Sequence, residues 1–547
     1  MSERKRMVVG GMTCRHCEDL VGQALEGAGA EEVEVSYRRG DAVFRGGDDA
    51  ALARAVREAG YRPGAIERLA GEAPAVTRRG SGSRGYDLVV LGSGSAAFAA
   101  AIRASDLGAR VAVVEAATVG GTCVNVGCVP SKALLRAAEL QHLAGSPRIP
   151  GLRIGAQPPD LAQIVAWKDE LVGTLRREKY LDLVELYGFD LLSGTAGFAG
   201  PDSVAVDGSL LSAESYLIAT GASPAAPPIP GLAEAGFLTS TSALEVTELP
   251  ARLAVIGANA IGLELGQYFA RMGSRVTLIE VLPRIAPFEE PEISQTLTEA
   301  LEAEGLTVLT DATVTAVSRE GDTRRLEVVL GGDRTALEVD ELLVATGRRP
   351  NTAALGLEQA GVTLDERGAV VTDEYLRTAN PRVFAAGDVT GSPQFVYVSA
   401  YEGALAAENA LNGSTRTLDL SALPRVTFTS PQVAAVGLTE AQAREAGYEV
   451  KTALLPLELV PRAIVNAETR GLIKLVADQA SDRLLGAHLL AEHAGEVIQA
   501  AVLAVKHDLT VRDLTETFHP YLTIAEGIKL AAQTFGRDVA TLSCCAA

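Results

Sequence analysis

Six cysteines fall into three pairs, and the spacing within each pair could support thiol chemistry. The pairs are Cys14/Cys17, Cys123/Cys128 and Cys544/Cys545. In a large chain of a reducing compartment, paired cysteines bind metals or carry electrons more often than they form structural disulfides. The three pairs are therefore the first candidates for function.

The central pair lies in the run 120–132, where Cys123 and Cys128 are five positions apart. Two such cysteines at the start of a helix can close a small disulfide. The helix dipole at that point lowers the pKa of a thiolate. The run therefore predicts a redox-active pair.

The two outer pairs are suited to a soft metal ion. Cys14 and Cys17 form a Cys-x-x-Cys on a loop that leads into a helix-like stretch, where two thiolates can hold such an ion linearly. A thioredoxin-like redox role is the rival interpretation, for which the unit is too short. Cys544 and Cys545 are adjacent, so a disulfide between them would be strained and both thiols tend to stay reduced.

Two further patterns could position nucleotides beside these thiols. Strand-like segments at 86–91 and 253–256 are each followed by a glycine-rich turn and a helical pattern, and Asn259 takes the middle glycine position of the second turn. Such turns let the backbone approach a pyrophosphate at a helix N-terminus, and an acidic residue about twenty positions on meets the ribose. The residues that predict nucleotide contacts are Gly92, Gly94, Ala97 and Glu115 in the first pattern, and Gly257, Gly262 and Glu280 in the second.

Glu280 also bears on the choice of nicotinamide nucleotide. A carboxylate at this position suits the free ribose hydroxyls of NADH and repels the additional phosphate of NADPH. Arg284 is close enough in the sequence to offset that repulsion. The sequence leaves both nucleotides open, and we expect NADH to be used well.

Length and charge narrow the possible partners. The chain has 547 residues and a formal net charge of −20, which argues against nucleic acid and against an anionic membrane surface. The basic N-terminal segment has no apolar stretch long enough for a signal peptide, and we find no uncharged apolar run of about 18 residues. We expect a cytoplasmic protein without stable membrane association.

The central motif, placed directly after a flavin-type βαβ unit, resembles the active site of the flavin disulfide reductases. Segments 219–221, 345–351 and 385–388 add to this resemblance, which covers roughly residues 85 to 547. It implies bound FAD, NADPH as electron donor with NADH possible, and a homodimer. It also implies that Cys128 lies against the flavin and that Cys123 exchanges with substrate. The FAD-contacting positions that it implies are Gly92, Gly94, Ala97, Glu115, Thr122, Lys132, Asp388 and Val396.

Two features favour the mercuric reductases within this family. A disulfide reductase needs a proton-carrying His oriented by a Glu, but Ile524 takes the orienting position after His519, and Glu526 lies two positions further on. An unoriented His is a poorer general acid–base catalyst. The terminal Cys544/Cys545 pair resembles the tail by which one mercuric reductase subunit delivers Hg(II) to the redox pair of the other. A dihydrolipoamide dehydrogenase-like disulfide reductase and a metal-sequestering protein with a vestigial flavin fold remain the alternatives.

The resemblance implies further site residues and partners. Tyr180 and Tyr521 match tyrosines that flank the metal, and the segment around Cys14 resembles the heavy-metal-associated domain. The expected substrate is Hg(II), delivered as thiol complexes or from a membrane mercury transporter. The expected metal ligands are Cys14, Cys17, Cys123, Cys128, Cys544 and Cys545.

The expected fold is α/β, with two Rossmann-like domains and a C-terminal α+β dimerisation domain, preceded by a small ferredoxin-like α+β metal-binding domain. A segment rich in Gly, Ser, Pro and Arg predicts a flexible linker after the first domain. The expected boundaries are 1–68 for the metal-binding domain, 69–84 for the linker, 85–220 and 351–423 for the FAD-binding domain, 221–350 for the NAD(P)H-binding domain, and 424–547 for the dimerisation domain with its metal-binding tail.

Overall fold

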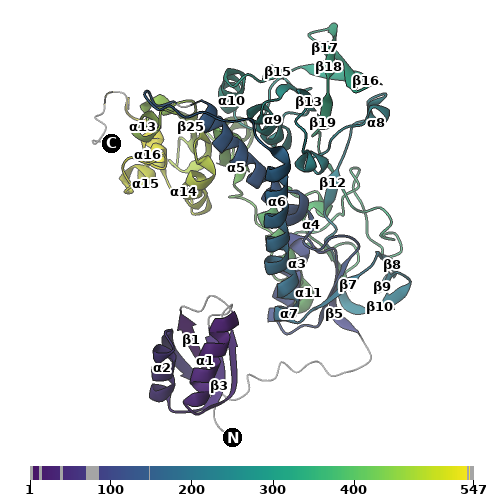
Figure 1. Ribbon diagram of the computed structural model, residues 1–547, viewed down its shortest axis with the longest axis vertical. Coiled ribbons are helices and arrows are strands. Elements are labelled where there is room, and N and C mark those ends of the chain that lie inside the picture. The colour runs from purple at the N-terminus through teal and green to yellow at the C-terminus, as the bar shows by residue number, and fades with distance from the viewer. Residues whose placement is uncertain are drawn as a thin grey trace. The chain divides into compact units, whose positions relative to one another are not determined.

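The computed structural model describes residues 4–10, 15–36, 41–68, 85–146, 148–538 and 541. The chain divides into two compact units, Met1–Arg84 and Gly85–Ala547, and each is described by itself. Figure 1 labels their helices and strands. Cys14, Cys544, Cys545 and the expected linker 69–84 lie outside the described residues.

The first unit is a small βαββαβ domain. Its elements are β1 Arg4–Gly10, α1 Arg15–Gly27, β2 Ala30–Ser36, β3 Asp41–Gly46, α2 Asp49–Glu58 and β4 Arg62–Arg68. The antiparallel sheet has the order β2-β3-β1-β4. Met7, Val21, Phe44 and Val56 belong to its core, which both helices and the sheet share. This confirms the ferredoxin-like fold that the sequence predicts.

The first domain of the second unit is built on a parallel sheet. Its strands are β5 Tyr86–Leu91, β6 Val111–Glu115, β7 Asp190–Ser193, β11 Ala213–Ile218 and β21 Val383–Ala385, in the order β21-β11-β5-β6-β7. Helices α3 Ser95–Asp106 and α11 Val396–Asn412 cover one face, and an antiparallel sheet of β8 Ala196–Gly200, β9 Ser203–Val206 and β10 Ser209–Leu211 covers the other. Since both faces are buried, the central strands are continuous apolar runs.

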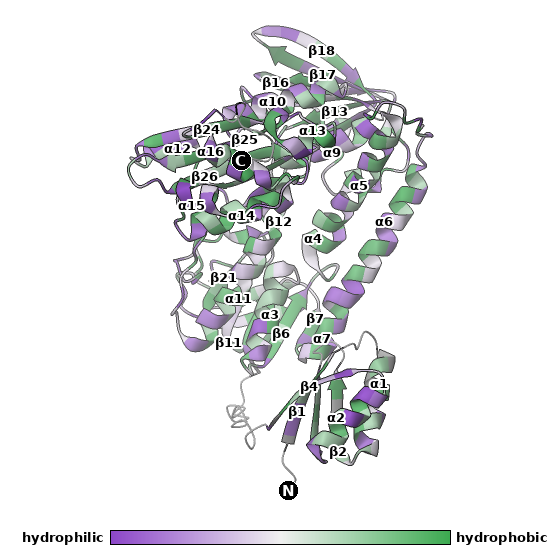
Figure 2. Cartoon of the chain, turned by 90° about the vertical axis from the view of Figure 1, so that its left-hand side faces the viewer, coloured by the Kyte–Doolittle hydropathy of each residue, from purple (hydrophilic) through white to green (hydrophobic). Residues whose placement is uncertain are grey.

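The redox motif lies at the start of a group of helices that follows β6. They are α4 Gly121–Val126, α5 Cys128–Gly145, α6 Leu161–Arg176 and α7 Asp182–Tyr187, and the π-helical turn η1 Arg177–Leu181 joins the last two. Asp160 caps α6 by accepting the backbone N–H of Gln163 at 3.0 Å. Figure 2 shows hydrophobic and hydrophilic residues alternating along α6, as is typical of a helix that packs on one side only.

The second nucleotide-binding domain repeats the parallel arrangement on a smaller scale. Strands β13 Arg252–Ile256, β14 Arg275–Ile279, β15 Thr307–Leu309 and β19 Glu341–Val344 form a sheet in the order β15-β14-β13-β19. Its helices are α9 Ala260–Met272 and α10 Pro291–Ala303, together with the short α8 Leu232–Ala235 and η2 Ser242–Glu245. An antiparallel sheet of β16 Ala312–Glu320, β17 Thr323–Leu330 and β18 Asp333–Val339 packs on it, and β12 Ala222–Pro224 pairs with β20 Arg348–Pro350 where the chain enters and leaves the domain.

The C-terminal domain is an antiparallel sheet covered by helices. Its strands are β22 Arg425–Thr427, β23 Gln432–Gly437, β24 Val450–Pro456, β25 Leu472–Asp478 and β26 Leu484–Ala491, in the order β22-β23-β26-β25-β24. The helices are α12 Glu440–Glu445, α13 Pro461–Val465, α14 Ala494–Lys506, α15 Val511–Glu516 and α16 Glu526–Gln533, and η4 Leu457–Leu459 is a single turn. The single turn η3 Asp388–Thr390 belongs to the first domain, shortly after β21. Strands β25 and β26 are buried along their whole length.

These domains confirm the expected fold class. In the part of the chain that the structure describes, no helix is both long enough and apolar enough to cross a membrane.

Candidate active site around Cys123 and Cys128

The redox motif folds into two helices that meet at Gly127. Cys123 lies within α4, and Cys128 is the first residue of α5. A side chain at Gly127 is excluded, because a Cβ there would lie 2.9 Å from the carbonyl oxygen of Thr122. Both cysteines are reduced, and the amide dipoles of α5 favour negative charge on the Cys128 sulfur.

The two thiols have opposite electrostatic environments. A hydrogen bond from the Cys123 thiol to the Cys128 sulfur raises the pKa of Cys123, and burial adds to this rise. The same hydrogen bond and the nearby Lys132 ammonium together lower the pKa of Cys128 to about 6, although burial acts in the opposite direction. Near neutral pH, Cys128 is therefore a thiolate and Cys123 a thiol.

Lys132 is anchored by a residue that the sequence reasoning missed. Its Nζ lies 2.7 Å from Oε2 of Glu264 on α9 and 4.6 Å from the centroid of the Phe428 ring. Glu264 is buried, and its other oxygen accepts the backbone N–H of Phe428 at 2.9 Å. Helix α5 is thereby tied to the second nucleotide-binding domain and to the C-terminal domain. No local motif marks Glu264, because its partner is 132 positions away.

The first glycine-rich turn leaves room for a phosphate group. Gly92 has a φ of +105°, and a Cβ there would lie 2.4 Å from the carbonyl oxygen of Ala219. Gly94 is the N-cap of α3 without a side-chain cap, so the first amides of that helix have no partner within it. Gly121 packs against this turn, since a Cβ on it would lie 2.5 Å from the Cα of Gly94. Ala97 is buried in the core beneath.

Two carboxylates flank the turn. Glu115 ends β6 and accepts the Ser93 hydroxyl at 2.5 Å. Asp388 begins η3, where burial raises the pKa of its carboxyl and the charge of Arg348 opposes that rise. The Ser399 hydroxyl of α11 donates to Asp388 Oδ1 at 3.4 Å.

Arg348 is a second site residue that had no assigned role in the sequence analysis. Its Nε lies 3.7 Å from Oδ2 of Asp388, and its Nη2 lies 3.4 Å from Oγ1 of Thr122 and donates to the Ala222 carbonyl. Its Nε is buried and has no hydrogen-bond partner. Thr122 and Asp388, which are far apart in the sequence, therefore both contact the guanidinium of Arg348. Val396 lies nearby in the chain as the first residue of α11, a helix start that again lacks a side-chain cap.

Tyr180 lies beside the cysteines, in the π-helical turn η1. Its ring packs edge-on against Phe98 with centroids 4.8 Å apart, and a Cβ on Gly120 would lie 3.5 Å from its Cγ. Burial raises the pKa of its hydroxyl, and the charges of Cys123 and Cys128 add to the rise. Such turns are frequent at functional sites.

The second glycine-rich turn has the same architecture as the first. A Cβ on Gly262 would lie 1.9 Å from the carbonyl oxygen of Gly257, so the helix can start this close only with glycine. Asn259 caps α9 with a φ of −104°, which any residue can adopt, so its replacement of a glycine carries no strain. Glu280 follows β14, and its Oε2 accepts the backbone N–H of Ala258 at 2.8 Å.

Comparison with known proteins agrees with this geometry. The pyridine nucleotide-disulphide oxidoreductase family matches residues 86–403, its dimerisation domain matches residues 423–532, and the heavy-metal-associated domain matches residues 7–62. Mercuric reductases from Bacillus cereus and Staphylococcus aureus are each 50% identical, over 100% and 99% of this chain and 87% and 99% of their own lengths. A mercuric reductase from Streptomyces lividans is 54% identical over 84% of this chain and 98% of its length. This chain belongs to the mercuric reductases.

Solved structures support the same fold for the second unit. The HOCl-induced flavoprotein disulfide reductase RclA from Escherichia coli is 32% identical with a TM-score of 0.74, over 82% of this chain and 99% of that one. LpdA from Mycobacterium tuberculosis is 26% identical with a TM-score of 0.74, over the same shares of the two chains. The cofactors of mercuric reductases are FAD and NAD(P)H.

The residues present fit both cofactors. At the first turn, the start of α3 has no side-chain cap and the buried Nε of Arg348 has no hydrogen-bond partner, and a bound FAD would supply acceptors for both. At the second turn, Gly262 lets α9 begin close to the turn, and the N-cap Asn259 makes no side-chain cap, so the first amides of α9 can donate hydrogen bonds to a nicotinamide nucleotide's phosphates.

The other expected site residues that the structure describes, Cys17 and Tyr521, lie in different domains of the chain. Cys17 is buried in the first turn of α1 among Met7 and Val21, while Cys14 lies outside the described residues. Tyr521 is half exposed in the C-terminal domain, between α15 and α16. Within the described ranges, no group of three or more His, Cys, Asp and Glu side chains could hold a metal ion.

His519 is half-buried, and its ring contacts the backbone of Thr517 rather than Glu526. Its Nδ1 faces the carbonyl oxygen of Thr517 at 3.1 Å. Glu526 is buried at the start of α16, where its Oε2 accepts the backbone N–H of Leu522 at 3.2 Å. The Glu526 carboxylate therefore stabilises its own loop.

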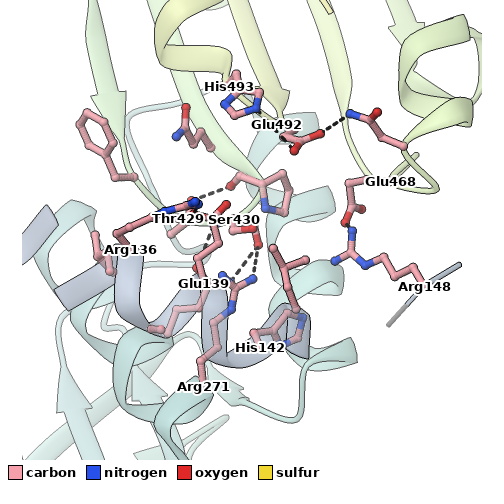
Figure 3. A pocket seen from close by; sticks show the side chains of 18 of the residues that line it. Arg136, Glu139, His142, Arg148, Arg271, Thr429, Ser430, Glu468, Glu492 and His493 are labelled. Atoms are coloured by element: carbon pink, nitrogen blue, oxygen red, sulfur yellow. Dashed lines mark hydrogen bonds and ion pairs between the residues drawn. The ribbon is translucent and has the colours of Figure 1, made fainter. Parts of the chain in front are cut away.

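A cavity of about 490 Å³ lies along α5, but neither cysteine lines it. Figure 3 shows Arg148 beside Glu468, with which it forms an ion pair, and Glu492 accepts a hydrogen bond from the amide of Asn466 at 2.6 Å. Arg271 is bound to Glu304 at 2.7 Å. Arg148 and Arg271 are therefore both paired with carboxylates.

Proposed function

We propose that this chain catalyses the reduction of Hg(II) to elemental mercury by NAD(P)H. One observation carries the proposal: a Cys128 thiolate lies hydrogen-bonded to the Cys123 thiol at the flavin-binding turn of a chain that is 50% identical to mercuric reductases over its full length. The balanced reaction is Hg²⁺ + NAD(P)H → Hg⁰ + NAD(P)⁺ + H⁺.

The cysteine pair binds the substrate in this mechanism. Hg(II) is a soft ion for which two thiolates are the preferred ligands. The Cys128 thiolate bonds to it directly, and Cys123 loses its proton as its sulfur bonds to the metal. Lys132, anchored by Glu264, keeps the inner sulfur ionised. Bound FAD supplies the hydride-accepting and electron-transferring chemistry. After two electrons have reached the metal, neutral mercury leaves and both sulfurs remain reduced.

We further propose that the metal arrives from a partner subunit. The match to the family's dimerisation domain over residues 423–532 supports a homodimer. In it, the Cys544/Cys545 tail of one subunit would pass Hg(II) to the Cys123/Cys128 pair of the other, with Tyr180 and the partner subunit's Tyr521 beside the metal. The half-exposed position of Tyr521 is compatible with such a contact.

The N-terminal unit would collect the metal upstream. Cys14 and Cys17 would receive Hg(II) from thiol complexes or from a membrane mercury transporter, and the match to the heavy-metal-associated domain over residues 7–62 supports this role. Thiol pairs that must stay reduced favour a cytoplasmic location.

Disulfide reduction of the dihydrolipoamide dehydrogenase type is the weaker candidate. That reaction needs a positioned proton carrier. The His519 ring faces the carbonyl of Thr517, and the Glu526 carboxylate accepts the backbone N–H of Leu522. This arrangement favours a reaction that needs no general acid.

Anaerobic turnover of the flavin-loaded enzyme with NADH or NADPH and thiol-bound Hg(II) tests the proposal. We expect one mercury atom to be released as vapour for each nucleotide oxidised. Rapid lipoamide reduction without mercury vapour would instead support the disulfide reductase, and metal binding without nucleotide oxidation would support a sequestering protein.

A further inference from the structure

The two nucleotide-binding halves of the chain can be compared at the acidic residue that is expected to meet a ribose, which is Glu115 in the flavin half. Glu115 ends β6, and its two oxygens accept the Ser93 hydroxyl at 2.5 Å and the backbone N–H of Ala117 at 2.7 Å. The carboxylate therefore faces the glycine-rich turn and is held by the chain just beyond it. The adenosine ribose of FAD carries two free hydroxyls, which a carboxylate at this position accepts as hydrogen-bond donors.

The nicotinamide half repeats this arrangement, with a backbone N–H of the turn in place of the serine hydroxyl. Glu280 follows β14; its Oε2 accepts the backbone N–H of Ala258 in the second turn at 2.8 Å, and its Oε1 accepts that of Leu282 at 3.0 Å. The carbonyl of Ala258 in turn accepts the N–H of Ala286 at 2.9 Å, which closes the turn against the segment after the strand. Glu280 is only 6% exposed, so its charge acts where water screens it weakly.

Arg284 is the one cation between residues 280 and 290. Its Nη2 donates to the carbonyls of Pro287 at 2.9 Å and Glu289 at 3.2 Å, and its Nε is buried without a hydrogen-bond partner. The guanidinium is therefore used to hold the loop together. In the part of the chain that the structure describes, it forms no ion pair with Glu280.

The exposed side chains of this segment are apolar. Val281, Leu282 and Phe288 are 61%, 41% and 70% exposed. A 2′-phosphate carries about −1.5 to −2 charges near neutral pH and is best bound by arginine forks. At this site it would meet a carboxylate and hydrocarbon.

We propose that the chain selects NADH over NADPH, with Glu280 as the specificity-determining residue and Arg284 as an anchor of the loop. This inference rests on the proposed function, in which a nicotinamide nucleotide binds at the second turn. It assigns the electron donor within that function, and Glu115 in the flavin half of the same chain holds the matching position after its strand.

Equilibrium binding to the flavin-loaded enzyme tests the inference without turnover. The probes are ADP-ribose and 2′-phospho-ADP-ribose, which lack the nicotinamide and cannot transfer a hydride, and the measurement is calorimetric. We expect ADP-ribose to bind at least tenfold more tightly. Equal or tighter binding of the phosphorylated probe would overturn the inference.

Two variants and a control sharpen the test. Leu282→Arg adds a cation and leaves the backbone N–H that anchors Glu280. It should reduce the ratio of the two probes' dissociation constants at least tenfold. Glu280→Gln removes the negative charge and should also reduce this ratio of dissociation constants, provided that the variant still binds ADP-ribose. Glu299→Gln, at an exposed position on α10, removes the same charge elsewhere and should leave the ratio unchanged. An unchanged ratio in Leu282→Arg would also contradict the inference.

Measuring mercury release together with probe binding distinguishes a failure of this inference from a failure of the proposed function. A higher kcat/KM with NADPH than with NADH, together with tight binding of 2′-phospho-ADP-ribose, would overturn the inference alone. No mercury release with either nucleotide, together with selective binding of ADP-ribose, would overturn the proposed function and support the ribose selectivity.

Discussion

Cys128 and Cys123 differ in ionisation although they are neighbours in one motif. The difference arises from three features around Cys128: the hydrogen bond from Cys123, the start of α5 and the ammonium of Lys132. The motif itself predicts the effect of the helix start, because that start depends on residues within one short run. It does not predict that Glu264, on another domain, holds Lys132 in place.

The rate at which iodoacetamide alkylates the reduced enzyme reports the pKa of Cys128. The thiolate is the reactive form, and its folded pKa is lowered to about 6, so the rate should be near its plateau at neutral pH and fall as the pH drops through 6. Lys132→Met should move this midpoint upward by roughly one unit, since it removes a nearby positive charge. The control is Arg136→Gln, whose guanidinium pairs with Glu139 further along α5. A midpoint that stays in place in Lys132→Met would show that Lys132 does not act on the thiolate.

Cys123→Ala and Cys128→Ala should each lower mercury reduction by at least about 10³-fold, because two thiolates are needed to hold the metal beside the flavin. Both variants should keep FAD, since glycine-rich backbone and Glu115 form its site. The measurements are mercury vapour and flavin absorbance, and Cys128→Ala should also lose any thiolate-to-flavin absorbance band on reduction. Cys17→Ala, in the other unit, is the matched cysteine control. Full activity in either core variant would disprove the assignment of the pair.

At the scale of elements, close backbone approaches determine where the helices lie. Helix α11 crosses α3 at Gly403, where a Cβ would lie 2.0 Å from the carbonyl oxygen of Ala96. The same crossing places Ser399 beside Asp388. The sequence patterns predict β5 and the helix after it correctly, since an apolar run bounded by glycine is a local signal. They do not predict η1, because its extra residue per turn leaves no mark in the periodicity.

Gly403→Ala should destabilise the flavin-loaded enzyme by about 1–3 kcal/mol and weaken FAD retention, because the added methyl forces α11 away from α3. Urea unfolding followed by flavin fluorescence measures both effects. Gly173→Ala in α6 is the matched control: nothing lies within 4 Å of its Cβ position. That change should be neutral or stabilising by up to about 1 kcal/mol. Equal effects of the two changes would show that the helix crossing tolerates a side chain.

At the scale of the whole molecule, two units have separate cores. The Met1–Arg84 unit buries its own set of residues, among them Phe44 and Leu52, and the Gly85–Ala547 unit contains both nucleotide turns and the redox pair. A tethered metal-binding unit can raise the local supply of substrate without shaping the active site.

Deletion of residues 1–84 should therefore leave kcat for small thiol-bound Hg(II) within about twofold of the full chain, because no group of the active site is removed. Mercury vapour release at saturating substrate measures this, and flavin content confirms that the shortened protein is folded. A large loss of kcat in a flavin-loaded truncation would mean that the first unit takes part in the chemistry.

The sequence by itself determined the chemistry that this protein can perform. Cysteine spacing, glycine-rich turns and the acidic residues that follow them are local signals, and they predicted the thiol pairs, both nucleotide turns and the fold class. The tertiary structure decided which charges are available to that chemistry. It showed that Glu264 anchors Lys132, that Arg348 joins Thr122 to Asp388, and that Arg284 is bonded to its own loop. These contacts depend on side-chain direction and on residues far apart in the chain, and neither is encoded in spacing along the sequence.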